Sequence, residues 1–62
     1  MGTTVLWAEV VVYSGLLLRC RVAGRQVDIP PQLIQPGTTV RQSGDEGFVV
    51  LPTWYAATLD LA

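Results

Sequence analysis

Hydrophobic and polar residues alternate most clearly over residues 16–23 of the chain. Apolar side chains occupy the even positions, and two arginines occupy odd ones, which is the two-residue period of a β-strand with one buried face. We therefore predict a strand here, with the arginines on its outer side. The inward set is Leu16, Leu18, Cys20 and Val22, and the outward set includes Arg19 and Arg21.

A longer segment, from Thr3 to Tyr13, is apolar on both of its faces. It is rich in β-branched and aromatic residues, which favour strands. A strand that is apolar on both faces is either central in its sheet or covered by another subunit. Glu9 lies in the middle of this segment, where an unpaired charge would be costly to bury. We expect it to pair with Arg19 or Arg21, or to lie at a subunit interface.

Turn-forming residues divide the rest of the chain into short elements. Together these elements predict an all-β fold, a small five-stranded SH3-like barrel with one short helical turn near the C-terminus, formed by residues 1–62 as a single domain. We expect a first hairpin of residues 16–23 and 26–29 that turns at Gly24 and ends at Pro30–Pro31. One helical turn at 32–35 and a type II turn at Pro36–Gly37 should lead into a second hairpin, with strands at Thr38–Gln42 and Phe48–Leu51. A helix capped by Thr53 should then run from Trp54 to about Leu61.

Composition adds an argument for assembly. The chain has 62 residues, of which 50% are hydrophobic and only 15% are charged, whereas ordinary soluble domains carry about 25% charged residues. Chains of this size bury only about 60% of their unfolded surface and are marginally stable alone. One cysteine and no histidine exclude an internal disulfide and leave no zinc site. We therefore expect a homo-oligomer without a metal or other cofactor.

Charge and targeting features narrow the class of protein further. Four arginines against five acidic residues give a net charge of −1, which argues against a sequence-independent nucleic-acid binder. No basic N-terminal region precedes an apolar run, and the apolar runs are far shorter than the about 20 residues that cross a bilayer. The free thiol fits a reducing compartment. We expect a cytoplasmic protein that does not enter the membrane.

Two groups of side chains are candidates for binding, and one cysteine is a candidate for chemistry. Arg19, Arg21 and Arg25 would form a positive patch if the hairpin forms as predicted, either for an anionic partner or simply as a solvated outer face. The aromatic residues are candidates for a subunit interface or the core, with a stacking platform for nucleic acid as the alternative. Cys20 has no histidine to activate it and is expected to be structural. The candidate contact residues besides the arginines are Trp7, Glu9, Trp54 and Tyr55.

Two stretches of the chain resemble a pattern found in small uncharacterised bacterial and phage proteins. The stretches are residues 24–34, which contain Ile29–Pro30, and residues 48–56, which contain Leu51–Pro52–Thr53–Trp54. Those proteins have a strand that ends in an apolar residue and proline, and a later strand that ends in Pro-x-Trp-Leu-Ala. The present chain departs from the pattern at Pro31, Leu33 and Tyr55. The resemblance covers about half of the chain, supports the small barrel and implies no activity.

The leading hypothesis is a non-enzymatic, oligomeric protein-binding or accessory module, derived from a phage or another mobile element. One alternative is an oligomeric enzyme that resembles the type II dihydrofolate reductases, SH3-like barrels of similar length with one active site in the pore of a tetramer. Residues 26–30 are a loose match to their pore strand, and Gln26, Asp28 or Tyr13 would line the pore. A small barrel that binds nucleic acid weakly is the other alternative.

Overall fold

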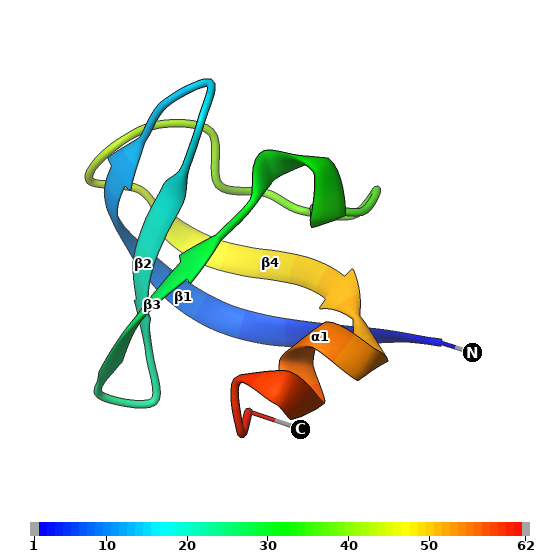
Figure 1. Ribbon diagram of the computed structural model, residues 1–62. Helices are drawn as coiled ribbons and strands as arrows, with labels where there is room; N and C mark the ends of the chain where they lie inside the picture. The colour runs from blue at the N-terminus through cyan, green and yellow to red at the C-terminus, as the bar shows by residue number, and fades with distance from the viewer. Residues whose placement is uncertain (1, 62) are drawn as a thin grey trace.

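The computed structural model describes residues 2–61, which form a mostly-β domain with one short helix (Figure 1). Four antiparallel strands make a single sheet in the order β3-β2-β1-β4. The prediction of a five-stranded closed barrel is wrong, because the described chain contains four strands in a sheet that does not close. The elements are β1 (Thr3–Tyr13), β2 (Leu18–Val22), β3 (Arg25–Ile29), η1 (Pro31–Leu33), β4 (Glu46–Pro52) and α1 (Thr53–Thr58).

The long strand β1 is central and joins the two halves of the sheet. It pairs with β4 from Thr3 to Glu9, and it pairs with β2 from Glu9 to Tyr13. The register with β2 shifts between Val10 and Val12, so the strand bulges at this point and bends. β1 is therefore a central strand of the sheet. This was one of the two explanations given for its two apolar faces; the other was a second subunit that covers one of them.

The hairpin of β2 and β3 forms as predicted, with a two-residue turn at Ala23–Gly24. Both residues have positive φ, 52° and 78°, which is the combination found in type I′ turns. Their twist matches the twist of the flanking strands. Ala23 has a side chain in a backbone region that disfavours one, so this turn holds local strain. The hairpin ends at Ile29, where Pro30 cannot donate to the ladder.

The predicted strand Thr38–Gln42 does not form, although this segment still lies along the outer edge of β4. The amide of Thr39 donates to the carbonyl of Phe48 at 2.9 Å, as a strand would. The amides of Phe48 and Val50, however, donate to the threonine hydroxyls Thr39 Oγ1 and Thr38 Oγ1. Two side chains thus replace the carbonyls of a fifth strand, and the ladder is interrupted.

The far end of the same segment is drawn into a turn by Asp45. One of its carboxylate oxygens accepts hydrogen bonds from the amides of Arg41 (2.8 Å) and Gln42 (3.1 Å). Gln42 in turn accepts from the amide of Asp45. These local bonds compete with strand pairing. They explain why residues 41–45 curl and why Val40 is buried without belonging to a strand.

The C-terminal helix α1 is shorter than predicted and begins one residue earlier, at Thr53. Thr53 does not cap the helix; its hydroxyl lies 2.9 Å from the hydroxyl of Thr4 and so ties the start of α1 to β1. The hydroxyl of Tyr55 donates to the carbonyl of Asp28 (3.0 Å), which attaches the helix to the edge strand β3. No helix within residues 2–61 has the length and apolar character needed to cross a membrane.

The core lies on the concave inner face of the sheet, beneath α1 (Figure 1). Cys20 belongs to it and is fully buried, as the alternation predicted. Side chains from α1 and the residues after it, including Tyr55, Leu59 and Leu61, pack against the core as partly buried neighbours. The buried cluster consists of Ala8, Val10, Leu18, Cys20, Val22, Val27, Ile29, Val40, Val49 and Leu51.

Candidate protein-docking face

The outer face of the sheet presents large apolar side chains to solvent. Trp7 on β1 and Phe48 on β4 are directly opposite each other, and their rings meet edge to face with centroids 5.1 Å apart. Even in this contact, Trp7 is 57% exposed and Phe48 is 46% exposed. Val5, the next outward residue of β1, is 58% exposed. We call Val5, Trp7 and Phe48 the apolar stripe.

Backbone geometry explains why the two rings are so close. The amide and carbonyl of Phe48 bond to Thr39, on the side away from β1. Trp7 and Phe48 therefore form a non-hydrogen-bonded pair of the antiparallel ladder, in which opposite side chains approach most closely. Edge-to-face contact is the favoured arrangement of two aromatic rings. The stripe is therefore already ordered in the free chain and loses little conformational freedom on contact.

A row of charged side chains crosses the sheet next to the apolar stripe. Glu46 on β4, Glu9 on β1 and Arg21 on β2 occupy adjacent positions in the register. Arg21 Nη1 lies 3.5 Å from Glu9 Oε1, which confirms Arg21 as the expected partner of Glu9. The carboxylates of Glu9 and Glu46 are directly opposite each other in the ladder, an unfavourable position for like charges.

The other arginine of β2, Arg19, is engaged with Asp28 on β3. Its Nε lies 2.9 Å from Asp28 Oδ1, and its Nη2 lies 3.4 Å from Asp28 Oδ2. The hydrogen bond from Arg19 lowers the pKa of the Asp28 carboxyl below its usual value. Arg19 and Arg21 share the outer face, as predicted, and Arg25 begins β3 beside the hairpin turn. Because Arg19 and Arg21 each meet a carboxylate of their own chain, their charges are largely compensated.

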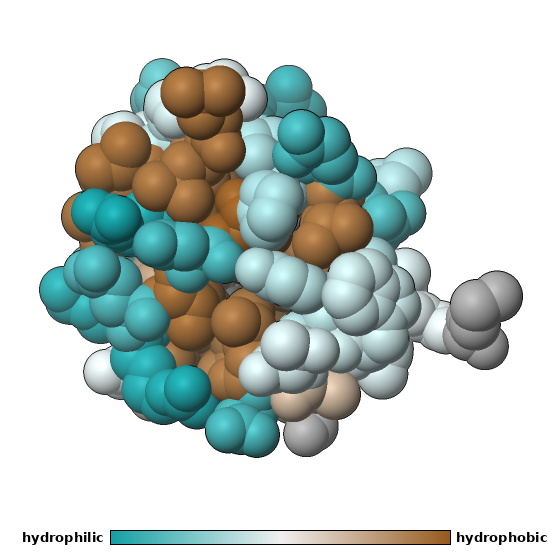
Figure 2. Space-filling model, in the orientation of Figure 1, coloured by the Kyte–Doolittle hydropathy of each residue, from teal (hydrophilic) through white to brown (hydrophobic). Residues whose placement is uncertain are grey.

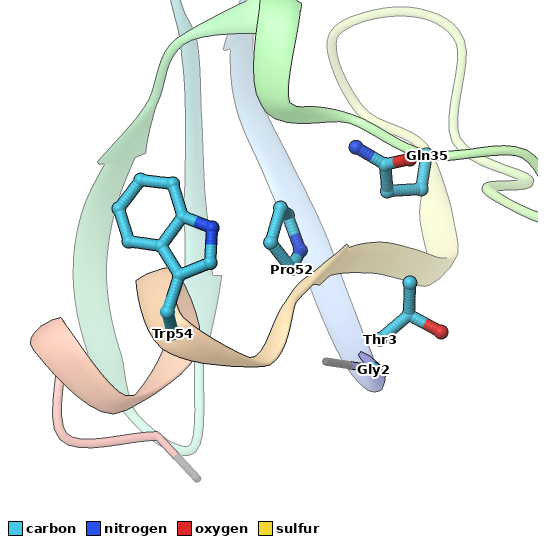
Figure 3. Close-up of a pocket in the computed structure, with 5 residues that line it drawn as sticks. All are labelled: Gly2, Thr3, Gln35, Pro52 and Trp54. Atoms are coloured by element: carbon cyan, nitrogen blue, oxygen red, sulfur yellow. The ribbon is translucent and has the colours of Figure 1, made fainter.

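The remaining aromatic candidates lie on α1 and not on the sheet. The rings of Trp54 and Tyr55 are perpendicular, with centroids 5.5 Å apart. Trp54 is 60% exposed, whereas Tyr55 is half-buried against the core. Trp54 and Pro52 border an open hollow of about 260 Å³ (Figure 3). The other lining residues are Gly2, Thr3 and Gln35.

The surroundings of Cys20, the single cysteine, favour a structural role in the core and not a reactive thiol. Burial raises the pKa of Cys20 to about 11, and the charge of Asp28 acts in the same direction. The reactive thiolate is therefore scarce at neutral pH. Among residues 2–61, the structure brings together no three His, Cys, Asp or Glu side chains that would suit a metal ion.

Sequence reasoning placed Val5, Trp7 and Glu9 on one face of their strand but missed Phe48 and Glu46 as parts of that face. Residues 48–51 were expected to pair with residues 38–42, and that pairing gives no reason to place Phe48 beside Trp7. In β4 the exposed residues Glu46 and Phe48 alternate with the buried residues Gly47 and Val49, and this two-residue period was a usable signal for an outward face. Leu16 was expected to point inward, yet it is 91% exposed in the loop between β1 and β2.

Comparison of the chain with protein-family models, with curated proteins and with solved structures finds no match.

Proposed function

We propose that this protein is a self-associating binding module that works through contact and not through catalysis, and that the outer face of its sheet is the contact surface. The observation that carries the proposal is the exposed edge-to-face pair of Trp7 and Phe48, which is ordered on the outer face of the sheet. Aromatic residues with a rigid, solvent-exposed position are typical of the centre of protein interfaces.

The size of the chain favours a whole face over a smaller contact. A standard interface covers about 800 Å² on each partner, and the described chain exposes 3856 Å² in total. About a fifth of the surface must then be covered, which a sheet face can supply. Burial of the apolar stripe would also add the stability that so short a chain lacks.

The charged row favours a second copy as the partner. β1 lies between β2 and β4, so a two-fold axis parallel to β1 would place β2 of one copy over β4 of the other. Arg21 of one copy would then face Glu46 of the second copy, twice in each dimer. This pairing would offset the charge of Glu46 and bring Val5 and Trp7 of the two copies together across the axis.

Sedimentation velocity over a concentration series tests the proposal. We expect the native chain to be a dimer or a larger species at tens of micromolar, and we expect Trp7→Ala to weaken association by roughly tenfold or more, because aromatic anchors dominate such interfaces. Val12→Ala, which removes an exposed apolar side chain from the other end of β1, is the control and should change little. A native chain that is monomeric at these concentrations would contradict the proposal.

Charge reversal tests the identity of the partner. Glu46→Arg should weaken self-association, because each two-fold contact would then oppose two arginines. The double variant Arg21→Glu, Glu46→Arg should restore it. If both variants associate as the native chain does, the two-fold arrangement is wrong even where Trp7→Ala has an effect.

Three finer assignments belong to the same proposal. We infer a relationship to SH3-like barrels, which is supported by the strongly bent central strand and by the strand-like pairing of residues 38–40 along β4. We also infer a cytoplasmic location and an origin among small bacterial and phage proteins. The free thiol supports the cytoplasmic location. Residues 29–30 and 51–54 support the bacterial or phage origin.

A further inference from the structure

The N-terminal half of β1 has a free edge on the side away from β4. At one end of the ladder with β4, the amide of Thr53 donates to the carbonyl of Gly2, and at the other end the amide of Val10 donates to the carbonyl of Asp45. Because bonding residues alternate along an antiparallel ladder, the even-numbered residues of β1 bond toward β4 and the odd-numbered ones direct their amides and carbonyls to the opposite side. β2 covers that opposite side only from Glu9 onward.

Three residues, Thr3, Val5 and Trp7, are therefore left with backbone groups that point away from any strand. Within residues 2–61, no hydrogen bond of a turn, loop or side chain reaches their amides or carbonyls. Figure 1 shows no strand beside this part of β1 on the side away from β4. The side chains of all three residues are exposed. The free edge is thus accessible to another extended chain.

The other two edges of the sheet are protected against such pairing. On β4, threonine hydroxyls accept the hydrogen bonds of the Phe48 and Val50 amides. On β3, the carbonyl of Asp28 accepts a hydrogen bond from Tyr55, and the charged residues Arg25 and Asp28 lie along the strand. Charged side chains, prolines and covering segments are the usual means by which proteins keep strand edges from pairing.

The free edge of β1 has neither charge nor proline. Residues 2–8 contain no charged residue and no proline. Figure 2 shows a pale surface at the right of the molecule, where Figure 1 places the start of β1, whereas strongly hydrophilic side chains gather on the left. Thr3, Thr4 and Val5 are β-branched, which favours cross-strand pairs. Two identical edges of this kind meet without charge repulsion, which favours a second copy of the chain as the partner.

We propose that the N-terminal half of β1 pairs with the same segment of a second copy, antiparallel about a two-fold axis beside Thr4. Thr3 of each copy then lies opposite Val5 of the other, and each of these pairs exchanges two backbone hydrogen bonds. The register of β1 with β2 puts Ala23 level with Trp7, so the hairpin turn stops the second strand before Trp7 and places the axis at Thr4. The strands β4 and β1 of both copies then form one continuous sheet.

This edge contact goes beyond the proposed face contact and does not depend on it. The face contact uses the side chains of the apolar stripe, whereas the edge contact uses backbone groups in the plane of the sheet. A two-fold axis perpendicular to the sheet keeps the outer faces of both copies on one side. The edge dimer therefore still presents Val5 and Trp7 of both copies to a further partner.

Amide hydrogen exchange over a concentration series tests the edge contact on the native chain. We expect the amides of Thr3 and Val5 to exchange at least tenfold more slowly at concentrations where sedimentation shows dimers than in dilute solution, because only the edge dimer gives them a hydrogen-bond partner. The amide of Gln26, on the outer side of β3, is the control and should exchange at one rate throughout. Rapid exchange of Thr3 and Val5 in a fully dimeric sample would overturn the edge contact and leave the face contact standing.

N-methylation of Val5 in a chemically synthesised chain removes the contact directly. The Val5 amide has no partner within residues 2–61, so the fold should persist, while the edge contact should weaken roughly ten- to a hundredfold because each dimer loses two hydrogen bonds. N-methylation of Gln26 is the matched control. Both chains also carry Trp7→Ala, so that the face contact does not mask the result. Equal association of the two methylated chains in sedimentation would contradict the edge contact.

Discussion

Residues 48–51 of β4 show how different the two faces of the sheet are. Val49 and Leu51 point inward and are fully buried, whereas Phe48 points outward and is 46% exposed. β1 repeats the contrast, with Ala8 buried and Trp7 open to solvent. The inner face contains small and medium aliphatic side chains that fill a closed core. The outer face carries the larger aromatic ones, although nothing in residues 2–61 covers them.

Hydrophobicity alone therefore does not identify a core in so small a chain. The apolar residues of the inner face stabilise the fold, and those of the outer face are available for a partner. Substitutions on the two faces should therefore separate folding from association.

Leu51→Ala should destabilise the fold by about 2–5 kcal/mol, because it removes a fully buried side chain and leaves a cavity. Phe48→Ala, on the same strand and the opposite face, should cost less, about 1–3 kcal/mol in dilute solution, because its side chain is only half-buried and loses part of its burial together with its contact with Trp7. Urea unfolding at a concentration below that of self-association measures both. Equal costs for the two variants would mean that the faces do not differ in the way described.

Ala23→Gly should stabilise the chain by about 0.5–1 kcal/mol, because it relieves a positive φ that disfavours a side chain. The change lies in the hairpin turn and touches neither face of the sheet. It should therefore raise the midpoint of urea unfolding and leave the sedimentation profile as it was. A loss of stability would show that Ala23 makes a contact worth more than the strain it causes.

The ion pair of Arg19 and Asp28 should produce the smallest effect, a mild sensitivity to acid. The hydrogen bond from Arg19 lowers the pKa of Asp28 in the folded state, so the unfolded state binds the proton more readily. The stabilisation is present above the pKa of an unfolded aspartate, about 3.9, and is lost as the pH falls through the lower folded value.

Thermal unfolding between pH 2 and pH 7 measures this dependence. Asp28→Asn should flatten the acid side of the profile, and Asp60→Asn, which alters an exposed carboxylate near the C-terminus, should not. Identical profiles for the native chain and Asp28→Asn would remove the ion pair as a source of acid sensitivity.

Features encoded over short distances were predictable from the sequence. The alternation around Cys20, the turn at Ala23–Gly24 and the strand end at Pro30 depend on neighbouring residues, and all three were predicted. The pairing of β1 with β4 joins segments about 40 residues apart, and no local pattern determines it. The fifth strand was wrong for a physical reason, since the hydroxyls of Thr38 and Thr39 accept the hydrogen bonds that strand pairing would have used.

The candidate site shows the same limit. Trp7 and Glu9 were identified from the unusual composition of their own strand, because an aromatic residue and a charge stood out among valines. Arg21 was named as one of two partners for Glu9, since neighbouring strands of a meander usually pair. Phe48 and Glu46 join this face only through the long-range register of β4. The complete surface therefore became visible only once the strand order was known.

The two threonines beside β4 affect how the protein can aggregate. An open strand edge with free amides is a template for further strands, and stacked edges of this kind grow into fibrils. Thr38 and Thr39 occupy the amides of Val50 and Phe48, so these two amides of β4 are not free to pair with a strand of another copy. Gly47 makes this protection possible, because a β-carbon there would collide with Thr39 Oγ1. Three small residues in this way block strand pairing along the β4 edge of the sheet.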